Sequence, residues 1–209
     1  MIQHFCEVAS KGPVKHLVFI LHGYGASAEN IMGLGEYWKS FVPTTLFIAP
    51  NAPEFVASVY GFQWFPIGNL EESLLTAGCK KAAPSLATFI KQMQEKHQVS
   101  WQNTCIVGFS QGAMLVLYTA LTQPHLCSKV IGYSGGVPMD PKDITSSPKD
   151  LDILLVHGAQ DDVVPATASK DANIMLKTAG FPVSLHLLPH LDHSIDERGL
   201  KLGQEFFGR

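Results

Sequence analysis

One stretch of the chain, CIVGFSQGAM at residues 105–114, places the motif Gly-x-Ser-x-Gly between an apolar run and a helix-favouring run. This order of strand, tight turn and helix is typical of a nucleophile elbow. Side chains at the two glycine positions would collide with the neighbouring strand or helix, and the turn strains the backbone of the serine. Ser110 is therefore expected at a helix N-terminus, where backbone N–H groups and the helix dipole favour a developing negative charge.

The same motif occurs a second time, as GYSGG at residues 132–136. The residues that follow distinguish the two matches. Ser110 is soon followed by AMLVLYTAL, a run of strong helix formers, whereas Ser134 is followed by GGVPMDP, whose two prolines exclude a helix. We therefore predict that Ser110 is the nucleophile and that Ser134 ends the next strand, in a turn.

Size and composition narrow the class of protein. The 209 residues, 46% hydrophobic and 16% charged, predict one domain over residues 1–209 with a sizeable core. A formal net charge of -3, without a cluster of Lys and Arg, argues against nucleic-acid binding. The sequence has neither a signal peptide pattern nor an apolar stretch long enough to span a bilayer. Four cysteines without a Cys-x-x-Cys pair favour free thiols in the cytoplasm.

Short apolar runs alternate with helical patterns along the chain, which predicts a mostly parallel sheet with helices on both faces. Strands are predicted at residues 5–9, 16–21, 45–49, 104–107, 130–133, 153–156 and 184–188. Helices are predicted at about residues 27–40, 71–97, 111–122, 166–179 and 194–207. The aromatic segment GFQWFPIG at residues 61–68 fits neither period, so we predict a loop lying over the sheet.

A serine hydroxyl needs a base that removes its proton and an acid that orients the base. In a parallel sheet such groups lie on loops after the carboxyl ends of strands. The strand at residues 153–156 is followed by HGAQDDVVP, which offers Asp161 and Asp162 as the acid. Because neighbouring side chains diverge, one of the two points into the site and the other is solvated or caps the next helix. Spacing alone does not choose between them.

Two histidines follow the strand at residues 184–188. His193 stands immediately before the last predicted helix, which would hold it in place, and Ser194 is available to cap that helix. His190, beside Pro189, is more typical of a surface loop. We therefore predict that His193 is the base.

The same segment raises the alternative of a zinc site. Its ligands would be His186, His190, Asp192 and His193. However, no His-Glu-x-x-His pattern occurs, and the set mixes a strand residue with loop residues. The sequence thus predicts neither a metal nor a cofactor.

An oxyanion hole requires two backbone donors near the nucleophile. The N–H group of Gln111, directly after Ser110, is the first. The second is expected in the loop LHGYG at residues 21–25, whose glycines allow close approach of the backbone, and we predict the N–H of Tyr24. His22 in the same loop is expected to be hydrogen-bonded structurally.

Together these pieces resemble the α/β-hydrolase fold and, within it, the phospholipase/carboxylesterase family that includes the acyl-protein thioesterases. The matching pieces cover almost the whole chain in family order, namely LHGYG at 21–25, PNAP at 50–53, WF at 64–65, GFSQG at 108–112, HGAQDDVVP at 157–165 and His193. The resemblance implies a sheet with helices on both faces, and a chain of 209 residues leaves no room for a large cap domain. It also implies that Asp161, in the family pattern His-Gly-x-x-Asp-x-x-Val-Pro, is the acid.

The resemblance extends to the substrate side of the site. It implies that an acyl groove is bordered by Phe62, Trp64, Phe65 and Ile67, although these side chains could instead fill core space beneath a loop. The chain departs from the family at Asp192, where relatives commonly have glycine. A carboxylate there would either favour the charged form of the base or face solvent.

These observations predict a metal-independent serine hydrolase that cleaves carboxylic esters or thioesters through an acyl-enzyme. The expected substrates are small acyl esters, lysophospholipids or acylated proteins, as for a carboxylesterase, lysophospholipase or acyl-protein thioesterase. The alternative is a binding protein that kept the fold and lost the reaction, but such proteins usually lack a triad member. The oligomeric state stays open, a homodimer included.

Overall fold

The computed structural model describes residues 2–8, 11–68 and 71–207. At its centre lies a seven-stranded sheet of order β1-β3-β2-β6-β7-β8-β9. β1 is antiparallel to β3, and every other neighbouring pair is parallel. The strands are β1 Phe5–Val8, β2 His16–Leu21, β3 Thr45–Pro50, β6 Thr104–Phe109, β7 Lys129–Tyr133, β8 Asp152–Gly158 and β9 Val183–Leu188. All seven predicted strands are confirmed, and Ala9, the predicted end of the first, lies outside the described residues.

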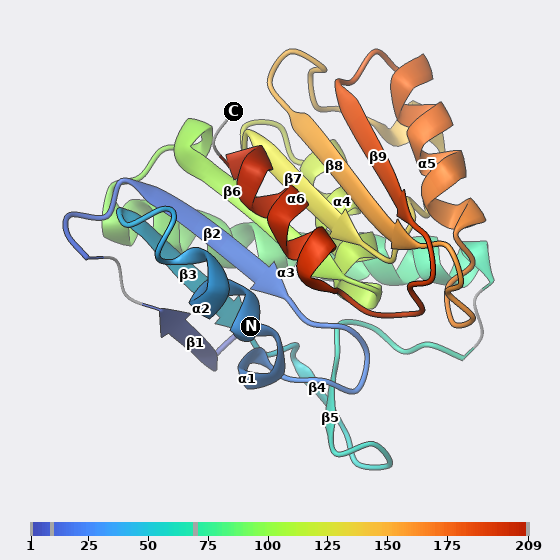
Figure 1. The fold of residues 1–209 in the computed structure, drawn as a ribbon, viewed down its shortest axis with the longest axis horizontal. Helices are drawn as coiled ribbons and strands as arrows, with labels where there is room; N and C mark the ends of the chain where they lie inside the picture. The colour runs from blue at the N-terminus through green and yellow to red at the C-terminus, as the bar shows by residue number, and fades with distance from the viewer. Residues whose placement is uncertain (1, 9–10, 69–70, 208–209) are drawn as a thin grey trace.

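Helices cover both faces of this sheet, as predicted (Figure 1). Buried residues of α1 Ala28–Ile31, α2 Gly33–Trp38 and α6 Glu197–Phe207 share one core with the strands. Those of α3 Glu72–His97, α4 Gln111–Thr122 and α5 Thr167–Thr178 share a core on the opposite face. The central strands are therefore apolar without alternation, and β3 is buried at every position. Two short 3-10 helices, η1 Trp101–Asn103 and η2 Pro141–Asp143, complete the helical elements.

Two predicted helices differ from the structure at their N-terminal parts. The helix predicted at 27–40 is broken into α1 and α2 with Met32 between them, where Gly33 and Gly35 lower the helix propensity. The helix predicted from residue 194 begins at Glu197, because the Asp196 carboxylate caps it and accepts from Gly199 N at 3.0 Å. The prediction that Ser194 caps this helix is therefore wrong.

The segment predicted as a loop at 61–68 contains a strand. β5 Gly61–Gln63 pairs antiparallel with β4 Glu54–Val56, and the resulting hairpin projects from the body of the molecule (Figure 1). Three-residue strands are too short for alternation to reveal them in a sequence. The hairpin is fixed to the loop after β2, since Gly25 N donates to Phe62 O and Phe62 N donates to Ala26 O.

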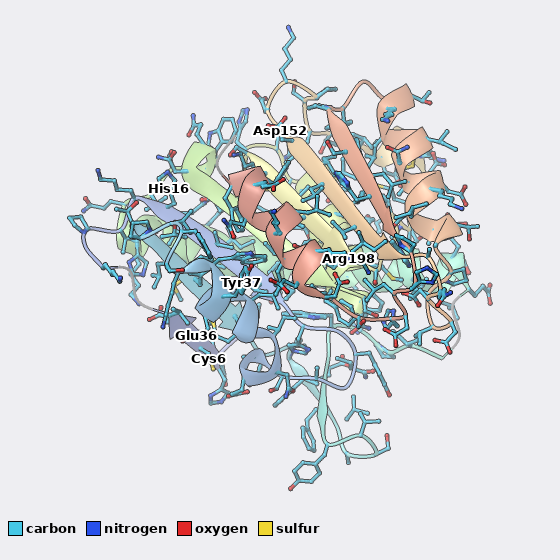
Figure 2. The ribbon with its side chains drawn as sticks, viewed as in Figure 1. Cys6, His16, Glu36, Tyr37, Asp152 and Arg198 are labelled. Atoms are coloured by element: carbon cyan, nitrogen blue, oxygen red, sulfur yellow. The ribbon has the colours of Figure 1, made fainter. Side chains whose placement is uncertain are left out.

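The carboxyl ends of the six parallel strands share one end of the sheet. Arg198, in the first turn of α6, lies towards this end, and His16 and Asp152, the first residues of β2 and β8, lie at the other end (Figure 2). Within the described residues no inserted cap domain covers the carboxyl end. No helix in the described part of the chain has the length and hydrophobicity needed to cross a membrane.

Candidate active site

Ser110 lies at the turn between β6 and α4, as predicted. Its φ of 54° and ψ of -118° place it outside the regions that side chains usually allow. Its N–H donates to Tyr133 O at 2.9 Å, which ties the turn to the neighbouring strand β7. The hydroxyl does not cap α4 and is therefore available to a partner outside the helix.

His193 and Asp161 meet at this hydroxyl. His193 Nε2 lies 2.9 Å from Ser110 Oγ, and His193 Nδ1 lies 2.7 Å from Asp161 Oδ2. The Asp161 side chain is 0% exposed and that of His193 is 16% exposed. The imidazole also packs against the Phe109 ring, with the ring centroids 4.8 Å apart. The structure thus brings the three predicted residues together from the loops after β6, β8 and β9.

The Asp161 carboxylate is held by backbone donors as well as by His193. Its Oδ1 accepts from Val163 N at 3.0 Å and from Val164 N at 2.8 Å. Burial raises the pKa of Asp161, but the hydrogen bonds from His193, Val164 and Val163 outweigh burial and leave the pKa below its usual value. The carboxylate is therefore charged at neutral pH. Asp162, the other acid considered, is exposed.

The other polar candidates of the loop after β9 are exposed to solvent. His190 is exposed, with a φ of 62°. Asp192 is also exposed, and its carboxylate accepts a hydrogen bond of 2.5 Å from Ser194 Oγ. His186 lies in β9, and no group of three or more His, Cys, Asp or Glu side chains among the described residues is arranged to hold a metal ion.

The residues predicted to supply the two oxyanion donors lie directly after Ser110 and in a loop that packs against it. Gln111 is the first residue of α4, so its N–H has no acceptor within the helix. Tyr24 follows Gly23, where an added Cβ would lie only 3.2 Å from Ser110 Cβ. The loop after β2 therefore packs closely against the serine turn at Gly23.

The side chain of Gln111 has a role that the sequence did not reveal. It is buried, its Oε1 accepts from Trp64 N at 2.9 Å, and its Nε2 donates to Phe65 O at 2.7 Å. Trp64 Nε1 in turn donates to His22 O at 2.9 Å. These bonds join the serine turn, the 61–68 segment and the loop after β2. Because the partners are far apart in the sequence, no local pattern could have predicted them.

His22 is buried and structural, as expected. Its Nδ1 donates to Gly23 O at 2.7 Å, and its Nε2 accepts from Ala52 N at 3.1 Å. Because a backbone N–H can only donate, Nε2 carries no hydrogen and the ring is neutral. Burial lowers the pKa of His22, which the hydrogen bond to Gly23 offsets in part.

The four residues predicted to border an acyl groove differ in exposure. Trp64 and Phe65 are buried, whereas Phe62 and Ile67 are partly exposed. A mostly apolar cavity of about 400 Å³ has Met114, one helical turn after Ser110, in its lining, and none of the four predicted residues lines it. Its lining includes Leu75, Met114, Val137, Met139, Ala172 and Met175.

Comparisons with known proteins find relatives that are named as esterases and thioesterases. The chain is 27% identical over 198 residues to esterase YpfH of Escherichia coli strain K12, covering 95% of this chain and 84% of that protein. It is 31% identical over 181 residues to acyl-protein thioesterase 1 of Kluyveromyces lactis, covering 79% and 78%. The crystal structure of esterase PE8 matches with 32% identity and a TM-score of 0.90 over 97% of this chain and 96% of that one.

These similarities confirm the predicted α/β-hydrolase fold. The model of the phospholipase/carboxylesterase family matches residues 3–208, which is nearly the whole length of the sequence. The chain therefore belongs to the phospholipase/carboxylesterase family.

Proposed function

We propose that the protein is a serine hydrolase that cleaves carboxylic esters or thioesters through an acyl-enzyme. The observation that carries the proposal is the continuous hydrogen-bonded chain from Ser110 Oγ through His193 to Asp161, with distances of 2.9 and 2.7 Å. This is the arrangement in which a base removes the serine proton and an acid fixes the tautomer of the base.

In the proposed reaction Ser110 Oγ attacks the acyl carbon while His193 Nε2 takes the hydroxyl proton. The charged Asp161 accepts from His193 Nδ1 and stabilises the imidazolium. The N–H groups of Gln111 and Tyr24 donate to the oxyanion. His193 then protonates the leaving alcohol or thiol, which departs and leaves the acyl group on Ser110. Water attacks the acyl-enzyme with His193 as base, and the carboxylic acid leaves as the serine regains its proton.

The apolar cavity that has Met114 in its lining supports an acyl chain as the group transferred. Of the four residues predicted to border the groove, we propose that Phe62 and Ile67 contact the substrate, because their side chains are partly exposed. We assign buried Trp64 and Phe65 to the support of the site. Relatives named esterase and acyl-protein thioesterase support small esters, lysophospholipids and acylated proteins as the substrates to compare.

We also propose a cytoplasmic location, which the cysteines support. Cys6, Cys79, Cys105 and Cys127 are all free. Burial raises the pKa of Cys79, Cys105 and Cys127, so these three thiols stay protonated and unreactive. Unpaired cysteines are typical of a reducing compartment.

The test compares fluorophosphonate labelling and p-nitrophenyl butyrate hydrolysis in the wild type, Ser110→Ala and Ser134→Ala. We expect Ser110→Ala to lose the label and at least about 10⁴-fold in kcat/KM. Ser134→Ala, a change of the same size in the second motif, should keep both. Labelling of Ser110→Ala at the wild-type rate would disprove the proposal. An unreactive, folded wild type would instead favour the binding-protein alternative.

A second measurement addresses the substrate. Rates with p-nitrophenyl esters and acyl thioesters of increasing chain length are compared, together with lysophospholipids of the same chains. An acyl-binding cavity predicts that kcat/KM rises with chain length until the cavity is filled. A rate independent of chain length would exclude the cavity as the acyl site.

A further inference from the structure

Asp161 has a second imidazole neighbour besides His193. His157 Nε2 lies 3.2 Å from Asp161 Oδ2, the oxygen that also accepts from His193 Nδ1. His157 is the penultimate residue of β8, and its side chain is 0% exposed. The proposed reaction uses neither of its ring nitrogens.

The surroundings of His157 Nε2 define it as a donor. It lies 2.9 Å from Val164 O in addition to its contact with Asp161. A carbonyl oxygen and an ionised carboxylate can only accept hydrogen bonds. His157 Nε2 therefore carries a hydrogen, which it donates to Val164 O, while Asp161 Oδ2 lies 3.2 Å from the same nitrogen.

Ser169 fixes the other side of the His157 ring. Its Oγ lies 2.6 Å from His157 Nδ1 and 2.6 Å from Gly135 O. Ser169 is also 0% exposed. Gly135 itself lies against the serine turn, because a Cβ there would be 3.2 Å from Ser110 O. A buried series of polar contacts thus connects the backbone beside Ser110 to the carboxylate of Asp161.

We propose that His157 is a positioning residue of the hydrolase, whose Nε2 edge holds the Asp161 carboxylate by a polar contact of 3.2 Å, and that Ser169 orients the His157 ring. The proposal rests on the proposed function. Without His157, the Asp161 oxygen that faces His193 would lose this second polar contact, and the carboxylate could rotate. Small errors in the orientation of catalytic groups lower kcat strongly.

The competing explanation is that His157 only stabilises the loop at 158–164 through Val164 O. Two substitutions separate the explanations, because a glutamine amide nitrogen reaches about as far as Nε2 of histidine and an asparagine amide nitrogen reaches about as far as Nδ1. His157→Gln retains an N–H group near Asp161 and loses the contact with Ser169. His157→Asn retains a group near Ser169 and leaves Asp161 without the second polar contact.

The experiment measures kcat and KM for p-nitrophenyl butyrate in the wild type and both His157 variants, with urea unfolding of each protein. We expect His157→Asn to lower kcat about 10- to 100-fold at a nearly constant KM, the range for loss of one polar contact with a charged group. We expect His157→Gln to restore most of kcat, although both variants lose stability.

Two buried serines provide the matched control. Ser169→Ala should lower kcat by less than His157→Asn. Ser134→Ala, at a position 1% exposed whose Oγ has no hydrogen-bond partner among the described residues, should leave kcat unchanged. Equal losses of kcat in the Asn and Gln variants would overturn the proposed role of His157 and leave the proposed function intact. The same holds if the loss of kcat follows the loss of stability across all the variants. An inactive wild type would overturn the proposed function together with this inference.

Discussion

The two Gly-x-Ser-x-Gly turns, at residues 108–112 and 132–136, end neighbouring parallel strands and hold their serines at similar positive φ angles. The φ angle is 54° at Ser110 and 49° at Ser134. The hydroxyls differ, because Ser110 Oγ contacts His193 whereas Ser134 Oγ is buried and has no partner within the described residues. α4 begins directly after Ser110, whereas no helix begins directly after Ser134. The motif thus sets the strained backbone, and the following helix determines whether the hydroxyl is presented at the site.

The largest expected difference between the two turns comes from a methyl group on the last glycine of each. A Cβ at Gly112 would lie 2.5 Å from Leu21 O and 2.6 Å from His22 O, backbone atoms that cannot move without distorting β2. We expect Gly112→Ala to lower the free energy of unfolding by about 3 kcal/mol or to prevent folding. Urea unfolding at neutral pH measures the loss.

Gly136→Ala is the matched control for this change. A Cβ at Gly136 would lie 3.1 Å from Ala168 Cβ, which a small shift of α5 relieves. We expect a loss of about 1 kcal/mol. If both alanine variants lost the same stability, the close approach of the loop after β2 would not be what distinguishes the first turn.

The sequence predicted the sheet and most helices because their signals are local. Strands buried on both faces are apolar runs, so all seven were found, and residues 16–21 and 111–122 match β2 and α4 at both ends. The β4–β5 hairpin was missed because each of its strands has three residues. The break between α1 and α2 was missed because an amphipathic pattern can continue across a bend.

The site residues that directly follow a strand could be predicted, because their place in the sequence determines where they lie in the fold. Residues that follow parallel strands meet at one end of the sheet, which is why Ser110, His193 and an aspartate could be proposed together. The choice of Asp161 over Asp162 depends on the loop conformation, in which two backbone N–H groups face one carboxylate oxygen. The contacts of the Gln111 side chain could not be predicted, because its partners come from a distant segment.

A second difference between the turns is the residue after the serine, which is Gln111 in one and Gly135 in the other. Gln111→Ala leaves Trp64 N–H and Phe65 C=O buried without a partner. Each unsatisfied group is costly, and we expect a loss of about 2 kcal/mol or more in the free energy of unfolding, measured with urea.

A glutamine on the hairpin serves as the control for this variant. Gln63 Nε2 donates to Glu54 Oε2 at 3.0 Å, and both side chains are only partly buried. We expect Gln63→Ala to cost about 0.5 kcal/mol or less. If Gln111→Ala lowers the free energy of unfolding by as little, water replaces the hydrogen bonds of the Gln111 side chain. Gln111 then does not hold the 61–68 segment.

The smallest expected difference is in how the free energy of unfolding depends on pH. Gly112 packs against the backbone of His22, whereas Gly136 packs against Ala168, which does not titrate. Burial lowers the pKa of His22 below its ordinary value of 6.5. As the pH falls below 6.5, the unfolded chain binds a proton at this residue while the folded protein does not. The free energy of unfolding therefore falls, by at most about 1.4 kcal/mol per pH unit for one group.

Urea unfolding at about pH 7.5 and about pH 5.5 measures this dependence. His22→Gln can keep both hydrogen bonds, since its amide accepts and donates, and should reduce the difference between the two pH values. His16→Gln is the control, because burial also lowers the pKa of His16, but that residue is exposed and should contribute less. If His22→Gln loses as much stability in acid as the wild type does, the acid sensitivity arises outside the loop that packs against the Ser110 turn.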